Sequence, residues 1–144
     1  MYSNIVVGTD GSTTAGRALA RAIELAKAFN ATLHIVSAYR APIVRAVNAE
    51  RGGSSEEVSW QVGASDEVDG ILATAQAKAA EAGVEAKTHG VSADPVDAIL
   101  GCSEAVGAEV IVIGSKGMER RLMGSIPNTV AHQAEVDILI VHTA

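Results

Sequence analysis

Short apolar runs alternate with amphipathic stretches along this whole sequence, and this alternation limits the possible fold more than any other feature. The run Val110-Ile111-Val112-Ile113 contains only β-branched residues, which is typical of a strand buried on both faces. Strands are predicted over residues 4–7, 31–38, 84–91, 109–113 and 136–142, and helices over 14–29, 65–83, 95–106 and about 125–134. Strands that alternate with helices specify a parallel sheet with right-handed crossovers. We therefore expect a single-domain α/β fold, with an open five-stranded parallel sheet and helices on both of its faces.

Two of the predicted strands are followed by loops that contain glycine. Gly8-Thr9-Asp10-Gly11 follows the first strand, and Gly114-Ser115-Lys116-Gly117 follows the fourth. In an open α/β sheet the ligand lies at the carboxyl ends of the strands, where the strand order reverses. The strand order 3-2-1-4-5 places these two loops side by side, so we expect them to build one site.

The second loop has the composition of a phosphate site. Glycine allows close approach of the backbone to a ligand, and the helix start at Ser125-Ile126-Pro127 offers unpaired N–H groups to an anion. Three of the eleven Lys and Arg residues, Lys116, Arg120 and Arg121, fall in this loop of an otherwise acidic chain. An ordinary charged surface turn is the alternative. The loop lacks the Gly-Lys-Ser/Thr ending of a P-loop, and no G-x-G-x-x-G follows a strand.

Composition excludes several classes of function. The chain has 144 residues, enough for one core without disulfides, and its net charge of -6 opposes nucleic acid and anionic membranes as partners. Aromatic residues make up only 3% of the chain, which disfavours a flavin site. The single cysteine, Cys102, suits a reducing cytoplasm and is expected to pack in a helix. No signal peptide or membrane span of ~20 apolar residues is recognisable.

The remaining stretches carry weaker signals. Residues 40–64 show no clear period and are predicted to form a long loop, with one short helical stretch around Val44 to Ala49. His34 is expected to pack within its strand, because no second metal-type residue stands at helpful spacing. The other histidines, His89, His132 and His142, are scattered in the sequence and are expected to be structural or exposed.

With these motifs placed, the chain resembles the universal stress protein family over essentially its whole length. The resemblance is carried by the Gly8-Thr9-Asp10-Gly11-Ser12 opening, the Val136-to-Val141 ending, and glycines in the family's G-x-x-G, nine residues, G-[S/T] pattern. Here Gly114, Gly117, Gly124 and Ser125 fit that pattern, except that only six residues separate Gly117 from Gly124. The resemblance implies one nucleotide-binding domain over residues 1–144, with a Rossmann-like fold of the adenine nucleotide alpha hydrolase type.

The resemblance also implies an adenine nucleotide as ligand: ATP, AMP or, in some members, cyclic AMP. It places Thr9 and Asp10 at the ribose or base, the main chain near Ala38 at the adenine, and the loop glycines with Ser125 at the phosphates. Asp10 is also suited to a Mg²⁺ ion bound to phosphates, although a turn or cap residue is the alternative. The expected nucleotide-binding residues are Gly8, Thr9, Asp10, Gly11, Ala38, Ile113, Gly114, Ser115, Lys116, Gly117, Arg120, Arg121, Gly124, Ser125 and Ile126.

Three functions remain open from the sequence. The first is a nucleotide-binding stress or signalling protein without catalytic or metal-ligating residues. The second is slow ATP hydrolysis or phosphoryl transfer, with the loop cations stabilising charge on the transferred group. The third is a flavodoxin-like carrier, because Thr9-Asp10-Gly11-Ser12-Thr13-Thr14 resembles a hydroxyl-rich phosphate loop.

The fifth strand predicts a partner. Ile138-Leu139-Ile140-Val141 is wholly apolar, and no lysine or proline protects it, although the proposed order puts this strand at an edge of the sheet. A second copy of the same strand would cover it symmetrically. We expect a cytoplasmic homodimer that pairs through this strand, as members of the resembled family often do.

Overall fold

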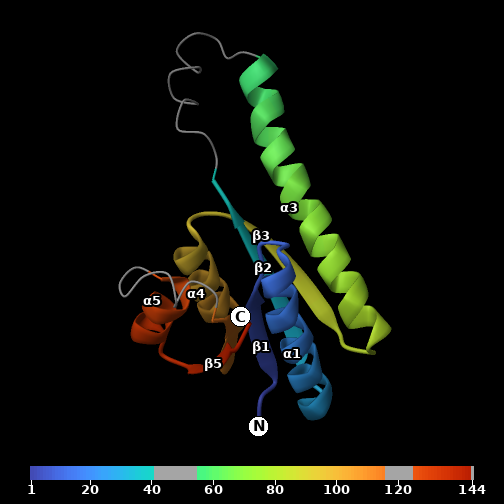
Figure 1. The fold of residues 1–144 in the computed structure, drawn as a ribbon, viewed down its shortest axis with the longest axis vertical. Coiled ribbons are helices and arrows are strands. Elements are labelled where there is room, and N and C mark those ends of the chain that lie inside the picture. Colours follow the sequence, from blue (N-terminus) through green and yellow to red (C-terminus); the bar gives the residue numbers. More distant parts are fainter. Residues whose placement is uncertain (41–54, 116–124, 144) are drawn as a thin grey trace.

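The computed structural model describes residues 1–40, 55–115 and 125–143, and for residues 55–64 it describes only the helical backbone. The elements follow one another in the expected alternation (Figure 1). They are β1 (Asn4–Gly8), α1 (Thr13–Phe29), β2 (Thr32–Tyr39), α3 (Ser55–Glu81), β3 (Ala86–Ser92), α4 (Pro95–Val106), β4 (Val110–Gly114), α5 (Ile126–Gln133) and β5 (Asp137–Val141). The five strands form one sheet in the order β3-β2-β1-β4-β5, and every pair is parallel. This confirms the predicted α/β class and strand order.

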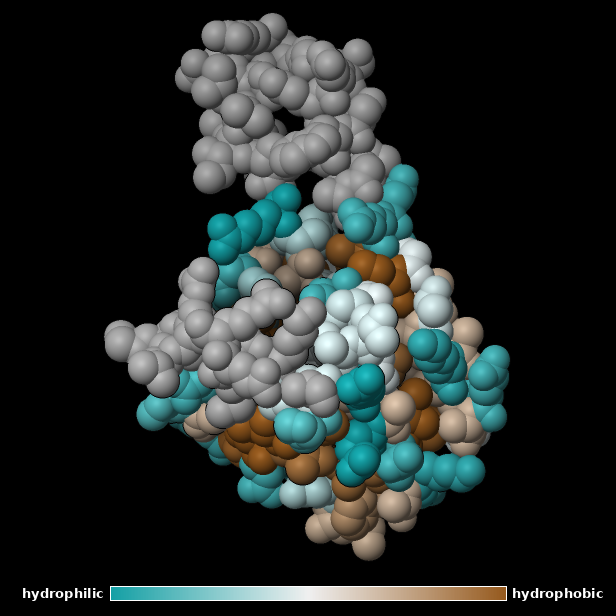
Figure 2. All heavy atoms as spheres, in the orientation of Figure 1, coloured by the Kyte–Doolittle hydropathy of each residue, from teal (hydrophilic) through white to brown (hydrophobic). Residues whose placement is uncertain are grey.

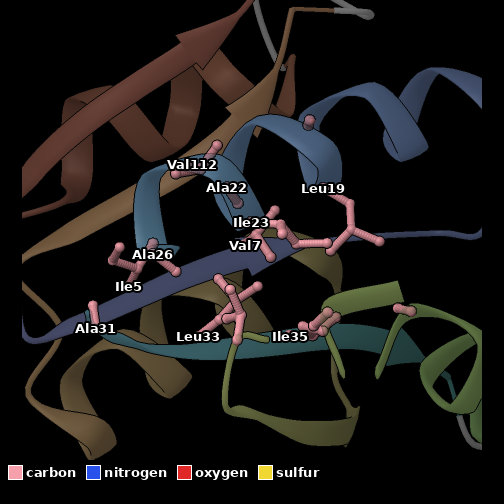
Figure 3. Close-up of a cluster of buried hydrophobic side chains, with 14 of the residues drawn as sticks. Ile5, Val7, Leu19, Ala22, Ile23, Ala26, Ala31, Leu33, Ile35 and Val112 are labelled. Carbon is pink, nitrogen blue, oxygen red and sulfur yellow. The ribbon is translucent and has the colours of Figure 1, made fainter. Parts of the chain in front are cut away.

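Each face of the sheet carries its own hydrophobic core. Successive residues of a strand point to opposite faces, so Ile5 and Val7 enter the core under α1 and α3, whereas Val6 enters the core under α4 and α5. All three side chains have no exposed surface. Figure 3 shows Ile5 and Val7 among side chains of α1, β2 and β4 on the first face. Each fully buried aliphatic side chain of this kind contributes about 1.5–3 kcal/mol, which holds β1 at the centre of the molecule.

Three helices begin at caps that the sequence predicts. In each case the cap side chain accepts the backbone N–H of the residue three positions further on: Ser12 from Ala15, Asp94 from Asp97, and Ser125 from Asn128. Alanine at such a cap costs about 0.5–2 kcal/mol. Proline follows Asp94 directly and stands two residues after Ser125, where its missing N–H leaves no helical hydrogen bond unmade. The caps fix where α1 and α5 start, and both starts lie at the carboxyl edge of the sheet.

The start of α3 differs from the prediction. The helix begins at Ser55, not at Ser65, so residues 55–64 belong to α3 and not to the predicted long loop. The later part of α3 packs on the sheet through the buried side chains of Val68, Leu72, Ala75 and Ala79. The apolar stripe therefore marks this packed part and does not mark the first residue of the helix. The predicted short helix around Val44 to Ala49 lies outside the described residues.

No helix in residues 1–40, 55–115 and 125–143 is long and apolar enough to cross a membrane.

Candidate nucleotide site at the ends of β1 and β4

A cavity of about 200 Å³ lies at the carboxyl ends of β1 and β4. These strands are neighbours in the sheet, and the strand order reverses between them, as expected for a ligand crevice. Residues of six elements, the β1–α1 turn and the segment after β5 line the cavity: Gly8, Thr9, Asp10, Ser12, Thr14, Ala15, Val36, Ala38, Pro95, Ala98, Ile99, Ile113, Gly114, Ile126, Pro127 and Thr143.

One wall of the cavity is apolar. Val36 and Ala38 point to the same face of β2, and α4 covers them with Ala98 and Ile99. Gly8 permits this close approach, since a Cβ at that position would lie 2.8 Å from Cδ1 of Ile99. A flat apolar ring fits such a wall better than a charged group does.

The opposite wall is polar and is formed by the turn between β1 and α1. Within this turn the Gly11 amide donates to Thr9 Oγ1 (3.1 Å), and the Ser12 amide donates to Asp10 Oδ1 (2.9 Å). Gly11 has φ of 81°, a conformation that side chains other than hydrogen disfavour. The Thr9 amide donates to the Val36 carbonyl (2.9 Å), which fixes the turn to β2. The turn therefore presents hydroxyl and carboxylate groups on a rigid backbone.

The start of α5 closes a third side. Ser125 is buried and accepts the Asn128 amide (3.3 Å), while Ile126 and Pro127 of the first turn line the cavity. A helix start carries unpaired N–H groups and about half a positive charge. This side of the cavity therefore favours an anionic group.

Seven of the fifteen predicted residues line the cavity. These are Gly8, Thr9, Asp10, Ala38, Ile113, Gly114 and Ile126. Ser125 caps α5 beside the cavity, and Ser115 directly follows Gly114. Gly11 lines a second cavity, between α1 and α3. The other predicted residues, Lys116, Gly117, Arg120, Arg121 and Gly124, lie outside the described residues.

Sequence reasoning missed the contribution of α4 and of the segment after β5. Pro95, Ala98, Ile99 and Thr143 carry no glycine or charge signal that would mark them as site residues. Val36 could have been found, because it stands two residues before Ala38 on the same strand face. The α4 residues and Thr143 reach the cavity only through tertiary packing.

Two ionisable groups near this region keep their ordinary charge state at neutral pH. The backbone amide of Asp97, which donates to Asp94 Oδ1 (3.1 Å), holds the pKa of the Asp94 carboxyl below its usual value. Burial raises the pKa of the Cys102 thiol to about 11, so it is a thiol and a poor nucleophile at neutral pH. The described residues contain no group of three or more His, Cys, Asp or Glu side chains that could hold a metal ion.

His89 has a structural contact that its position in the sequence did not reveal. His34 Nδ1 lies 3.1 Å from His89 Nε2. The parallel register pairs Val36 with His89, which brings the two imidazoles to the same face of neighbouring strands. His34 Nε2 also lies 3.1 Å from Asn4 Oδ1. His34 is buried, as expected for a residue packed within its strand.

Comparison with known proteins matches these features to one family. The model of the universal stress protein family matches residues 1–142. The universal stress protein Rv1636 of Mycobacterium tuberculosis is 35% identical over 146 residues, which cover 99% of this chain and 97% of the relative. The universal stress protein YxiE of Bacillus subtilis is 30% identical over 98% of this chain and 99% of the relative. A crystal structure of a universal stress protein in complex with cAMP superimposes with a TM-score of 0.77 at 34% identity, covering 99% of this chain and 98% of the other. The chain belongs to the universal stress protein family.

Proposed function

We propose that this protein binds an adenine nucleotide, AMP, ATP or cyclic AMP, in the cavity between β1 and β4, and acts in stress response or signalling and not as a metabolic enzyme. One observation carries the proposal: a single cavity combines an apolar wall, a turn with hydroxyl and carboxylate groups, and a helix start. A nucleotide needs these three environments for its base, its ribose and its phosphates. The cAMP held by a solved relative at 34% identity supports an adenine ligand.

In this proposal each part of the nucleotide has its own wall. The adenine lies against Val36, Ala98 and Ile99, next to the main chain of Ala38. The ribose hydroxyls meet Thr9 and Asp10. The phosphates meet Gly114 and the start of α5, with Lys116, Gly117, Arg120, Arg121 and Gly124 of the glycine loop completing the cradle. For ATP, Asp10 is the one carboxylate among the described lining residues that suits a phosphate-bound Mg²⁺.

Binding is tested directly by calorimetric titration with AMP, ATP and adenosine. Mass spectrometry of any ligand released from the purified, denatured protein identifies the bound nucleotide independently. We expect AMP and ATP to bind more tightly than adenosine, since only they reach the α5 start. No heat with any of the three compounds, together with no released nucleotide, would refute the proposal.

A sensor differs from an enzyme in turnover. The described lining residues include no histidine, cysteine or lysine, and the one carboxylate among them, Asp10, is proposed to meet ribose hydroxyls and not the phosphate that would be transferred. We therefore expect phosphate release from ATP to stay below ~1 per minute, far under the turnover of ordinary enzymes. Steady release above that rate would favour the slow ATPase reading. The described lining also includes no aromatic residue to stack on a flavin, so we expect the purified protein to be colourless, and a yellow protein would favour the flavodoxin-like carrier.

We also propose that the protein is a homodimer through β5. In the described part of the chain β5 pairs with β4 on one side only, and Leu139 and Ile140 are each 37% exposed. The surface view shows a hydrophobic patch where Figure 1 places β5 (Figure 2). The opposite edge strand, β3, carries the exposed residue Lys87, which discourages pairing. An antiparallel second copy of β5 would satisfy the free edge and cover its apolar side chains.

A further inference from the structure

We infer that Thr143 is a positioning residue for the phosphate side of the nucleotide site, held in place by Arg17 and Ser115. The inference rests on the proposed nucleotide binding and assigns a role to the segment after β5. Thr143 lines the cavity and is only 1% exposed. A polar residue buried to this degree two positions beyond the end of a strand needs a defined set of partners.

The first part of the argument is how the β4–β5 ladder ends. Gly114 pairs with Val141 in the parallel register, and the Ser115 amide donates to the Val141 carbonyl (2.8 Å). One step further, the Thr143 amide donates to Ser115 Oγ (3.1 Å). The serine hydroxyl thus replaces the backbone carbonyl that a longer β4 would have offered. The segments that follow β4 and β5 therefore stay hydrogen-bonded beyond the end of β4, at the edge of the sheet where the cavity lies.

The second part is the cation on α1. Arg17 Nη1 donates to the Thr143 carbonyl (3.0 Å), so both backbone groups of Thr143 are bonded to different elements. A hydrogen bond from a charged donor is stronger than a neutral one. Arg17 therefore links α1 to the segment after β5. Its guanidinium binds the backbone of Thr143, a residue that itself lines the cavity.

The third part is steric. A Cβ on Gly114 would lie 3.0 Å from Thr143 Cγ2 and 3.4 Å from Thr143 Oγ1. The Thr143 side chain thus occupies the space into which a side chain at position 114 would project. Gly114 and Thr143 both line the cavity, and we expect a displacement of Thr143 to reach Ser115 through the hydrogen bond to its hydroxyl.

The three contacts act on the end of the cavity that is proposed to hold phosphates. The apolar wall of Val36, Ala98 and Ile99 belongs to β2 and α4, whereas the hydrogen bonds of Arg17 and Ser115 to Thr143 join α1 to the exits of β4 and β5. Loss of the Arg17 contact should therefore weaken the binding of AMP and leave the binding of adenosine nearly unchanged. A residue that acted only on overall stability would affect both ligands alike.

The first experiment compares Arg17→Ala, Arg17→Lys and Arg21→Ala by calorimetric titration with AMP and adenosine, together with thermal unfolding. Arg21 is the matched control because it lies on the same helix, is exposed and pairs only with Glu24 at 3.2 Å among the described residues. We expect Arg17→Ala to weaken AMP about threefold to tenfold, the effect of one net hydrogen bond, and adenosine by less than about twofold. Arg17→Lys should recover part of the loss, since lysine can still donate to the carbonyl.

The second experiment tests the steric contact. Gly114→Ala should weaken AMP because its Cβ displaces Thr143, and Thr143→Ser, which lacks Cγ2, should restore part of the affinity in the double variant. Strictly additive losses would overturn the inference, as would equal AMP affinities for Arg17→Ala and Arg21→Ala. If the parent protein binds none of AMP, ATP and adenosine and releases no nucleotide on denaturation, the proposed function itself fails. If the parent protein binds AMP but these variants do not discriminate, only the role of Thr143 fails.

Discussion

Acidification should destabilise this protein through the His34–His89 pair. His34 Nε2 lies at Asn4 Oδ1, which can only accept, so this nitrogen carries the proton and His34 Nδ1 accepts from His89 Nε2–H. A proton on both imidazoles would put two N–H groups against each other over 3.1 Å. Burial lowers the pKa of both rings, with nearby Lys87 adding to the effect on both and the partner imidazole adding to it on His34. Glu85 opposes the shift at His34, and Cys102, in the α4-side core, stays neutral.

The sign and size of the effect follow from proton linkage. Both folded pKa values lie below the unfolded value of about 6.5, so the unfolded chain binds more protons and stability falls as the pH drops below 6.5. Each proton contributes at most about 1.4 kcal/mol per pH unit, so the pair contributes at most about 2.8 kcal/mol per unit. The loss between pH 6.5 and 5 stays below this ceiling, because solvent screens the partly exposed His89. The depressed carboxyl pKa values of Asp94 and Glu109 act only at lower pH.

The assay is urea unfolding at pH steps from 7.5 to 5 on three proteins. His89→Gln keeps a donor for His34 Nδ1 but removes one titrating group. The dependence of the unfolding free energy on pH should therefore be weaker in this variant, by up to half of the slope of the parent protein. His132→Gln, at an exposed position on α5, should keep the parent slope. Equal slopes for the parent and His89→Gln would refute the reasoning, because the pair would then take up no extra proton on unfolding.

Three further predictions use other parts of the structure. Gly8→Ala should lower the free energy of unfolding by about 1–3 kcal/mol, because its Cβ would overpack against Ile99. Ile99→Val removes the atom at 2.8 Å, so urea unfolding should show the double variant to be less destabilised than the sum of the two single variants. Ile140→Lys should convert the proposed dimer to a monomer in light scattering, and a parent protein that is already a monomer at micromolar concentration would contradict pairing through β5. Because the glycine loop is short, we expect its cations to contribute to phosphate binding. The double variant Arg120→Glu with Arg121→Glu should weaken ATP binding but not adenosine binding, and the difference should be smaller at high salt. Equal ATP affinity of this variant and the parent protein at low salt would count against this role.

The fold was predictable because its signals are local. β1, β2, β4 and β5 contain short apolar runs, β3 is the more polar exception, and each of α1, α4 and α5 starts at a cap visible in the sequence. The start of α3 was predicted wrongly, because hydrophobic periodicity indicates packing against a sheet and the first ten residues of α3 lack that periodicity. Ser54 and Glu57 stand at capping-box spacing, and this sequence signal could have placed the start correctly.

The candidate site was predictable only where the chain itself brings residues together. The ends of β1 and β4 follow from topology, so Thr9, Asp10 and Gly114 were placed correctly at the cavity. Ile99 and Thr143 arrive by packing of distant elements, and neither residue type marks a site. The His34–His89 contact spans 55 positions and depends on the β2–β3 register, which periodicity does not supply.

The floor of the cavity continues directly from the most protected strand of the molecule. Gly8 follows Ile5, Val6 and Val7, none of which has any exposed surface, and β1 is bonded to a strand on each side. Amides of such a strand exchange with solvent only when the whole domain opens, whereas α5 has eight residues and lies at the periphery of the sheet. A bound ligand would therefore slow exchange in β1 only by the factor 1 + [L]/Kd that it adds to global stability, while local opening of α5 would be suppressed separately. We therefore expect amides of β1 to exchange only by global opening and amides of α5 to exchange by local opening, so that hydrogen exchange with and without ligand would separate the two sides of the site.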